Sequence, residues 1–190
     1  MVLCALVFPA AGLRADAAAE LRQDLLAATL RAIGLEIQET ERKLQAAQAG
    51  TGSEENLRRF RQKLADLERE RDRLAGLDPE DYPAPVSDPA EAGSVLDEAT
   101  GFGTVIPPLI REVVTEAGGP CTAGRCGDGA QLAVEGTSRS GPFYRLAGIA
   151  GGDYGLLKPG KRLRLELCLV YRREYFGLIG DYYVYVSRVR

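Results

Sequence analysis

The chain has 190 residues, a net charge of −3 and an apolar fraction of 45%. That length allows one or two modest domains, and that composition excludes a chain that is disordered throughout. Histidine is absent, which removes the usual general base of serine and cysteine hydrolases and the commonest zinc ligand. We therefore expect a protein that is not an enzyme and that holds no metal or cofactor.

The first residues form a short apolar run, followed by Ala15-Asp16-Ala17, a small-x-small triplet that fits a secretory cleavage site. The run is too short for an ordinary transmembrane helix, so no stable membrane span is expected. We expect residues 1–17 to be a signal peptide and the protein to be periplasmic or secreted. The alternative is that the run is a buried N-terminal segment.

Residues 18–76 predict two helices that fold back on each other. Apolar residues recur in steps of four and three on both sides of a break at 49–53, which is the pattern of a coiled-coil seam. The break is too short for a parallel pair, so an antiparallel hairpin is expected. The predicted hairpin seam contains Leu26, Leu30, Ile33, Ile37 and Leu44 in the first helix and Leu57, Phe60, Leu64, Leu67 and Leu74 in the second.

The first helix carries a second apolar line, which consists of Leu21, Leu25, Ala28, Ala32 and Leu35. One partner helix cannot cover both lines, so this line needs another surface. A second copy of the hairpin would supply that surface in a four-helix bundle, and we expect a homo-oligomer with this line as its seam. The alternatives are coverage by the β domain or by a different protein, or a line too shallow to matter because of its alanines.

The next segment, residues 77–100, holds seven acidic residues, no basic residue and four prolines. It is expected to be an extended, semi-rigid linker that packs no core. From residue 101 to residue 190, short apolar stretches separated by Gly and Pro predict a small antiparallel barrel-like domain. The predicted fold class is therefore α+β, with a helical hairpin followed by an all-β domain.

The best strand candidates lie toward the C-terminus. Along 161–171, leucines alternate with Arg162, Arg164, Glu166 and Cys168, as in a strand with one buried face. The turn between the last two strands is expected at Gly180-Asp181. The predicted strands are 102–106, 110–115, 131–135, 143–149, 161–171, 174–179 and 182–189.

Several local features of residues 143–190 point to one family. They are Tyr144-Arg-Leu-Ala-Gly-Ile, Leu157-Lys-Pro-Gly before a long strand, Cys168 late in that strand, and Glu174-Tyr-Phe-Gly-Leu-Ile-Gly before a final aromatic strand. In these features the segment resembles the bacterial Src-homology-three-like barrels of the cell envelope, although the tryptophan usual near their penultimate strand is absent. The resemblance implies a module that binds peptidoglycan peptides or proteins rather than a catalyst.

Tyrosines and arginines are concentrated near the C-terminus. We expect a recognition surface for a cell-wall or protein ligand, formed by Tyr171, Arg172, Arg173, Tyr175, Tyr183 and Tyr185. The alternative is that alternate tyrosines are core residues or cross-strand pairs. Spacing along a strand places Tyr183 and Tyr185 on one face and Tyr182 and Val184 on the other.

Two of the four cysteines, Cys121 and Cys126, flank a turn-rich loop. In an oxidising compartment they could close a small disulfide ring, and unlinked loop thiols are the alternative.

The expected function is that of an exported, non-catalytic adaptor or scaffold. Its hairpin would associate with itself or bind a partner protein, and its β domain would bind a cell-wall or protein ligand. A purely structural coiled-coil protein is the alternative. A more remote one is a hydrolase that uses the carboxylates of Asp153, Glu166, Glu174 and Asp181, which requires two of them to converge in a cleft. The slight basic surplus of residues 101–190 is too small to indicate a nucleic-acid partner.

Overall fold

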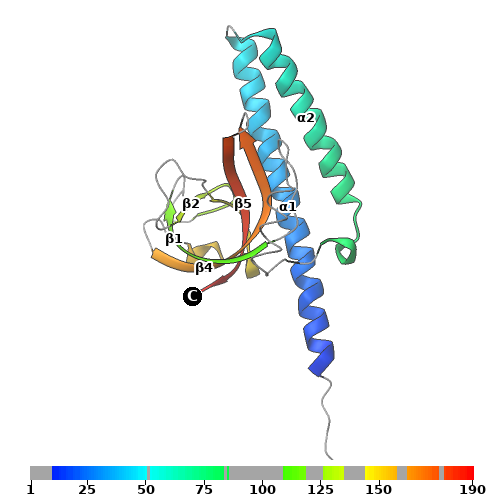
Figure 1. The fold of residues 1–190 in the computed structure, drawn as a ribbon, viewed down its shortest axis with the longest axis vertical. Helices are drawn as coiled ribbons and strands as arrows, with labels where there is room; N and C mark the ends of the chain where they lie inside the picture. Colours follow the sequence, from blue (N-terminus) through cyan, green and yellow to red (C-terminus); the bar gives the residue numbers. More distant parts are fainter. Residues whose placement is uncertain are drawn as a thin grey trace, which may run out of the picture.

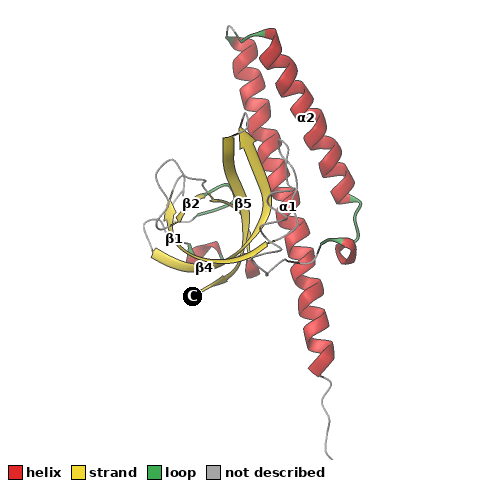
Figure 2. Ribbon diagram, in the orientation of Figure 1, coloured by secondary structure: helices red, strands yellow, loops and turns green. Residues whose placement is uncertain are grey.

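The computed structural model describes the two helices and the strands of a small barrel, which Figure 2 distinguishes by colour. The residues described are 10–50, 52–83, 85, 109–118, 126–134, 144–157, 162–175 and 178–190. Within these ranges, the side chains of 10–15, 109–118, 133–134, 173–175 and 178–181 are outside the description. The predicted strand at 102–106 and the predicted linker beyond residue 85 also lie outside it.

A long helical hairpin forms one side of the molecule (Figure 1). Helix α1 spans Ala10–Ala49 and helix α2 spans Glu54–Ala75, which gives lengths of about 60 Å and 33 Å at 1.5 Å per residue. Ser53 caps α2 by accepting a hydrogen bond from the Asn56 amide at 3.3 Å. Because α1 begins at Ala10, it includes the triplet that we predict to be a cleavage site.

The strands close into a small barrel in the order β1-β2-β3-β5-β4. Their bounds are Leu109–Gly118 (β1), Gln131–Val134 (β2), Tyr144–Ile149 (β3), Arg162–Tyr175 (β4) and Leu178–Val189 (β5). The predicted α+β class, with a hairpin followed by a barrel, is confirmed. One pair differs from the antiparallel expectation, because β3 and β5 are parallel.

The turn expected at Gly180-Asp181 is wrong. Both residues lie inside β5, and β4 already pairs with β5 at Tyr175 and Leu178. The predicted strand 174–179 therefore combines the end of β4 with the beginning of β5, and the predicted strand 182–189 lies entirely within β5.

Two cores share the barrel wall. The inner core includes the alternating leucines of β4 together with Leu146, Val184 and Val186. The outer core lies between the barrel and α1, and it includes Ala147, Cys168, Val170, Tyr171, Tyr183 and Tyr185 from the strands. Figure 1 shows α1 lying between the barrel and α2. The predicted alternation of β4 is thus confirmed. On its outward face Arg162 and Arg164 are exposed, whereas Cys168 and Val170 belong to the core shared with α1.

The beginning of the predicted linker packs against α1, which corrects the expectation that this segment joins no core. Tyr82 is 2% exposed and belongs to the outer core, and Leu77 packs partly buried against it. The Tyr82 hydroxyl forms a 2.6 Å hydrogen bond with Thr29 Oγ1, and Arg22 Nη1 donates to the Glu80 carbonyl at 2.8 Å. A short 3₁₀ turn, Pro79–Asp81, allows this return to α1.

Alanine substitutions at two glycines are expected to act with opposite signs. Gly34 lies inside α1 and a Cβ there would meet no atom within 4 Å, so Gly34→Ala should stabilise the protein by about 0.5–1 kcal/mol. Gly148 lies beneath the Arg31 guanidinium, and its Cβ would also come within 3.2 Å of the Tyr185 ring. Gly148→Ala should therefore cost about 1–2 kcal/mol, because Arg31 must move and the ring must shift. Urea unfolding of both variants measures the two changes in the free energy of unfolding. Changes of the same sign would contradict the surroundings described for Gly34 and Gly148.

Candidate functional site

The surface predicted for ligand recognition is mostly covered. Tyr171, Tyr183 and Tyr185 are at most 2% exposed and lie in the core between the barrel and α1. Tyr171 and Tyr183 are also cross-strand partners, with ring centroids 5.9 Å apart. The prediction that these three tyrosines form an open recognition surface is therefore wrong, and the alternative of core and cross-strand packing holds. Arg172 is half-buried, while the side chains of Arg173 and Tyr175 lie outside the description.

The second apolar line of α1 is the counterpart of this tyrosine face. Leu25, Ala28 and Ala32 are fully buried, and Leu21 and Leu35 pack against the same core. Of the surfaces considered for this line, the β domain is the one that covers it within a single chain. The line is therefore not an open oligomer seam, because the barrel occupies it.

The hairpin seam is buried beside the barrel and less buried toward the turn. Ile33, Leu67 and Leu74 are at most 4% exposed, and Leu26 and Ile37 join them in the outer core. Leu30 and Leu64 pack partly buried against that core. By contrast, the members nearest the turn are half-buried and belong to neither core; they are Leu44, Leu57 and Phe60.

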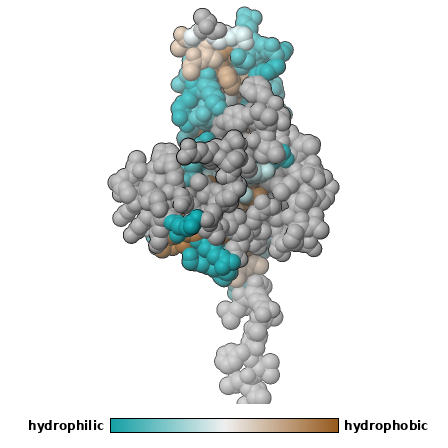
Figure 3. Space-filling view, turned by 60° about the vertical axis from the view of Figure 1, so that its left-hand side comes forward, coloured by the Kyte–Doolittle hydropathy of each residue, from teal (hydrophilic) through white to brown (hydrophobic). Residues whose placement is uncertain are grey.

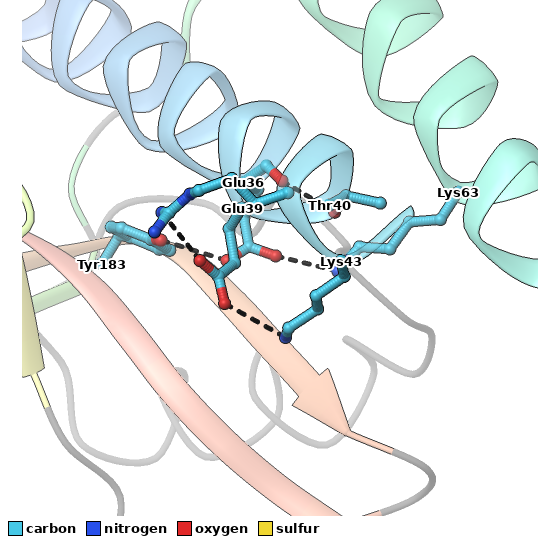
Figure 4. Close-up of polar contacts among 7 residues, drawn as sticks. Glu36, Glu39, Thr40, Lys43, Lys63 and Tyr183 are labelled. Atoms are coloured by element: carbon cyan, nitrogen blue, oxygen red, sulfur yellow. Dashed lines mark hydrogen bonds and ion pairs between the residues drawn. The ribbon is translucent and has the colours of Figure 1, made fainter. Parts of the chain in front are cut away.

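One buried carboxylate joins α1, α2 and the barrel (Figure 4). The Glu36 side chain is 0% exposed, and its Oε2 accepts a 2.8 Å hydrogen bond from Lys63 Nζ, which is 12% exposed. Its Oε1 accepts a 3.0 Å hydrogen bond from the Tyr183 hydroxyl of β5. The arrangement pairs a buried carboxylate with an ammonium group and fixes three elements relative to one another. Sequence reasoning missed Glu36, although an acid between two apolar lines of a helix was a possible signal.

A second polar group attaches the side of the barrel to α1. Arg31 Nε donates to the Ala147 carbonyl at 2.6 Å and lies 3.9 Å from Asp128 Oδ2. Asp128 Oδ1 accepts a 2.6 Å hydrogen bond from the Tyr154 hydroxyl. The Tyr185 hydroxyl also donates to Asp24, which lies about two helical turns before Arg31 on α1. These contacts hold polar side chains between elements, and none of them presents an activated nucleophile.

Cys126 lies two residues before Asp128 and is disulfide-bonded. Its expected partner, Cys121, lies outside the described residues. Cys168 is a free, fully buried thiol.

The carboxylates considered for hydrolysis have separate structural contacts where they are described. Asp153 accepts from the Gly155 amide at 3.1 Å. Glu166 accepts from Ser187 Oγ at 3.2 Å and pairs with Arg190 at 3.5 Å. The side chains of Glu174 and Asp181 lie outside the description. Among the residues that the structure describes, no cluster of three or more candidate metal ligands occurs, and no helix has the length and apolar character of a membrane span.

Comparison with known proteins adds no assignment: no family model, curated protein or solved structure matches this chain.

Alkaline pH is expected to weaken the attachment of residues 77–82 to α1. Burial raises the pKa of the Tyr82 phenol from 10 to about 12. A group whose pKa is raised by folding contributes its full stabilisation at pH values below its pKa in the unfolded state. The contribution of Tyr82 is therefore complete below pH 10 and is lost as the pH rises through 12. That shift corresponds to about 2–3 kcal/mol. Urea unfolding between pH 8 and pH 12 should show the decline.

Tyr82→Phe provides the control for the alkaline prediction. The variant loses the hydrogen bond to Thr29 and should be less stable at pH 7 by about 1 kcal/mol. Its stability should then decline less steeply than that of the parent protein above pH 10. Equal slopes in the two proteins would show that Tyr82 does not cause the alkaline loss.

Proposed function

We propose that this protein is a non-catalytic scaffold in which the barrel anchors the part of the hairpin that packs against it. The end of the hairpin that carries the turn between α1 and α2, called the distal hairpin below, binds a protein partner. The observation that carries the proposal is the core shared by α1 and the barrel, which contains the apolar line of α1 and the tyrosine face of β4 and β5. Neither the sheet nor the helix could bury its apolar face alone, so the shared core joins the two into one rigid unit. The hairpin beyond it extends past the barrel (Figure 1).

The surface of this distal hairpin supports a binding role. Its seam residues are half-buried rather than buried, and Figure 3 shows apolar surface among hydrophilic surface at the hairpin end. Apolar surface bordered by charged groups is typical of protein contacts. The tyrosines named for a barrel ligand are covered, so the proposal assigns partner binding to the hairpin.

An exported location belongs to the same proposal. Support comes from the disulfide at Cys126, because disulfides persist in oxidising compartments. The resemblance to Src-homology-three-like envelope barrels agrees with a binding protein in the periplasm, and peptidoglycan remains a ligand that this resemblance implies.

Photo-crosslinking in the native cells tests the proposal. A photoreactive amino acid is placed at Gln45 or Gln48, which are exposed on the distal part of α1, and at Arg188, which is exposed on the barrel as a matched control. We expect a discrete protein adduct from the hairpin positions, removed by an excess of unlabelled chain, and none from Arg188. Adducts from the barrel alone would overturn the assignment to the hairpin, and the absence of any adduct would favour a purely structural role.

A further inference from the structure

Helix α2 covers the side of α1 that faces away from the barrel (Figure 1), and few of its side chains are buried there. Of its 22 residues, Leu67 and Leu74 are buried. The other apolar seam residues, Leu57, Phe60 and Leu64, are half-buried. Because the packing of an apolar face is what mainly holds a helix in a protein, the contact that keeps α2 in place is a small one.

The charged groups of α2 interact both within the helix and across to α1. Arg69 pairs with Asp66 of the same helix, whereas Lys63 Nζ donates to Glu36 Oε2 of α1 at 2.8 Å. Pairs within α2 persist when the helix leaves α1. Glu36 then still accepts the 3.0 Å hydrogen bond from Tyr183 of the barrel, so departure of α2 does not strip this carboxylate of its contact with β5.

Arg71 is a weak point in the contact between α2 and α1. It occupies the place between Leu67 and Leu74 in the four-and-three spacing of the seam. Its side chain is 46% exposed and pairs with Asp72 of its own helix. A leucine in this place would add apolar contact with α1. Another helix with an apolar residue there would therefore bind α1 more strongly than α2 does.

The connection after α2 is long enough for the helix to move aside. Tyr82 stays on α1 through its 2.6 Å hydrogen bond with Thr29, and six residues separate it from Gly76, the C-cap of α2. Six residues reach about 20 Å when extended, and a helix with its side chains is about 10 Å across. Once the turn Pro79–Asp81 unwinds, α2 can swing about the 50–53 connection by more than its own diameter.

We propose that α2 is a displaceable cover, and that the seam of α1 beneath it binds a helix of a partner protein. This site comes in addition to the distal hairpin of the proposed function. It consists of Leu26, Ile33 and Ile37 with Glu36 beside them, all at most 8% exposed while α2 is in place. An apolar seam that contains a carboxylate selects an amphipathic helix with a lysine or arginine beside its apolar stripe, because the carboxylate needs a partner when it is covered.

A peptide with the sequence of residues 54–75 and the change Arg71→Leu is the probe for this site. Labelled with fluorescein, it should bind the full chain saturably, as measured by fluorescence anisotropy. The same peptide with Lys63→Glu added should bind at least about tenfold more weakly, because two carboxylates would then meet at Glu36. Arg71→Leu in the full chain should also weaken binding of the probe at least about tenfold, since a tighter cover competes from within the same molecule.

Arg69→Leu in the full chain is the matched control. It places a leucine on the outer side of α2, where the Arg69 side chain is 75% exposed, and it should leave binding of the probe unchanged. Hydrogen exchange of the full chain, followed by mass spectrometry, measures the opening itself. The amides of α2 should exchange at least about tenfold faster than those of residues 25–37 of α1, because α2 opens while α1 stays on the barrel.

The inference is overturned if the probe does not bind at millimolar concentration, if Lys63→Glu in the peptide has no effect, or if α1 and α2 exchange at one common rate. Dimers of the full chain that the probe dissociates, detected by sedimentation equilibrium, would identify α2 of a second copy as the occupant and would overturn the assignment to a partner protein. Crosslinking from Gln45 and Gln48 tests the proposed function separately, because both positions lie on the distal hairpin.

Discussion

Replacing Ala32 with glutamate is expected to lower the free energy of unfolding by about 3–5 kcal/mol, because the new carboxylate would be buried without a partner. Ala32 is 0% exposed in the core between α1 and the barrel. Such a loss is a large share of the about 5–15 kcal/mol that stabilises an ordinary domain. Chemical denaturation, followed by far-ultraviolet circular dichroism, measures it.

Ala46→Glu is the matched control, because Ala46 is an exposed alanine on the same helix. Its effect should stay within about 1 kcal/mol, including the unfavourable contact of an acid with the C-terminal end of the helix dipole. Similar losses in the two variants would mean that the barrel does not cover α1 at Ala32.

The second large effect is expected from Lys63→Met. This change removes the ammonium group that pairs with Glu36, whose side chain is 0% exposed, and should cost about 3 kcal/mol because a buried carboxylate loses a close charge partner. Adding Glu36→Gln should restore most of the loss, since the amide oxygen can still accept the hydrogen bond from Tyr183. Urea unfolding of the single and double variants measures the recovery.

Lys43→Met is the control for this experiment. Lys43 lies 3.3 Å from Glu39, a carboxylate that is 29% exposed, so the change should cost less than about 1 kcal/mol. A double variant that is no more stable than Lys63→Met alone would contradict the assignment of a buried ion pair.

The sequence predicted the elements better than their contacts. Local periodicity was enough for the hairpin seam and for the alternating leucines of β4, because both patterns depend on neighbours along the chain. The apolar line of α1 and the pair Tyr183 and Tyr185 were each recognised as faces that need explanation. The sequence of either face does not show that it packs against the other, which lies some 150 residues away along the chain. The apolar line of α1 was therefore assigned to a second copy of the chain, and the tyrosines were assigned to a ligand.

The polar contacts were harder to predict for a related reason. Glu36, Lys63 and Tyr183 come from three elements that only the tertiary fold brings together. Similarly, Tyr82 lies within an acidic, Pro-rich sequence that is typical of a linker, and only the tertiary fold brings it to the core and to its hydrogen-bond partner Thr29.

Thiol reactivity of Cys168 tests most directly whether α1 and the barrel form one unit. This free thiol is 0% exposed in their shared core, and burial raises its pKa to about 12. Under native conditions, labelling of the peptide that carries Cys168, followed by mass spectrometry, should proceed no faster than global unfolding. Rapid labelling while the barrel and the helices remain folded would show that α1 leaves the barrel, and it would contradict the scaffold proposed here.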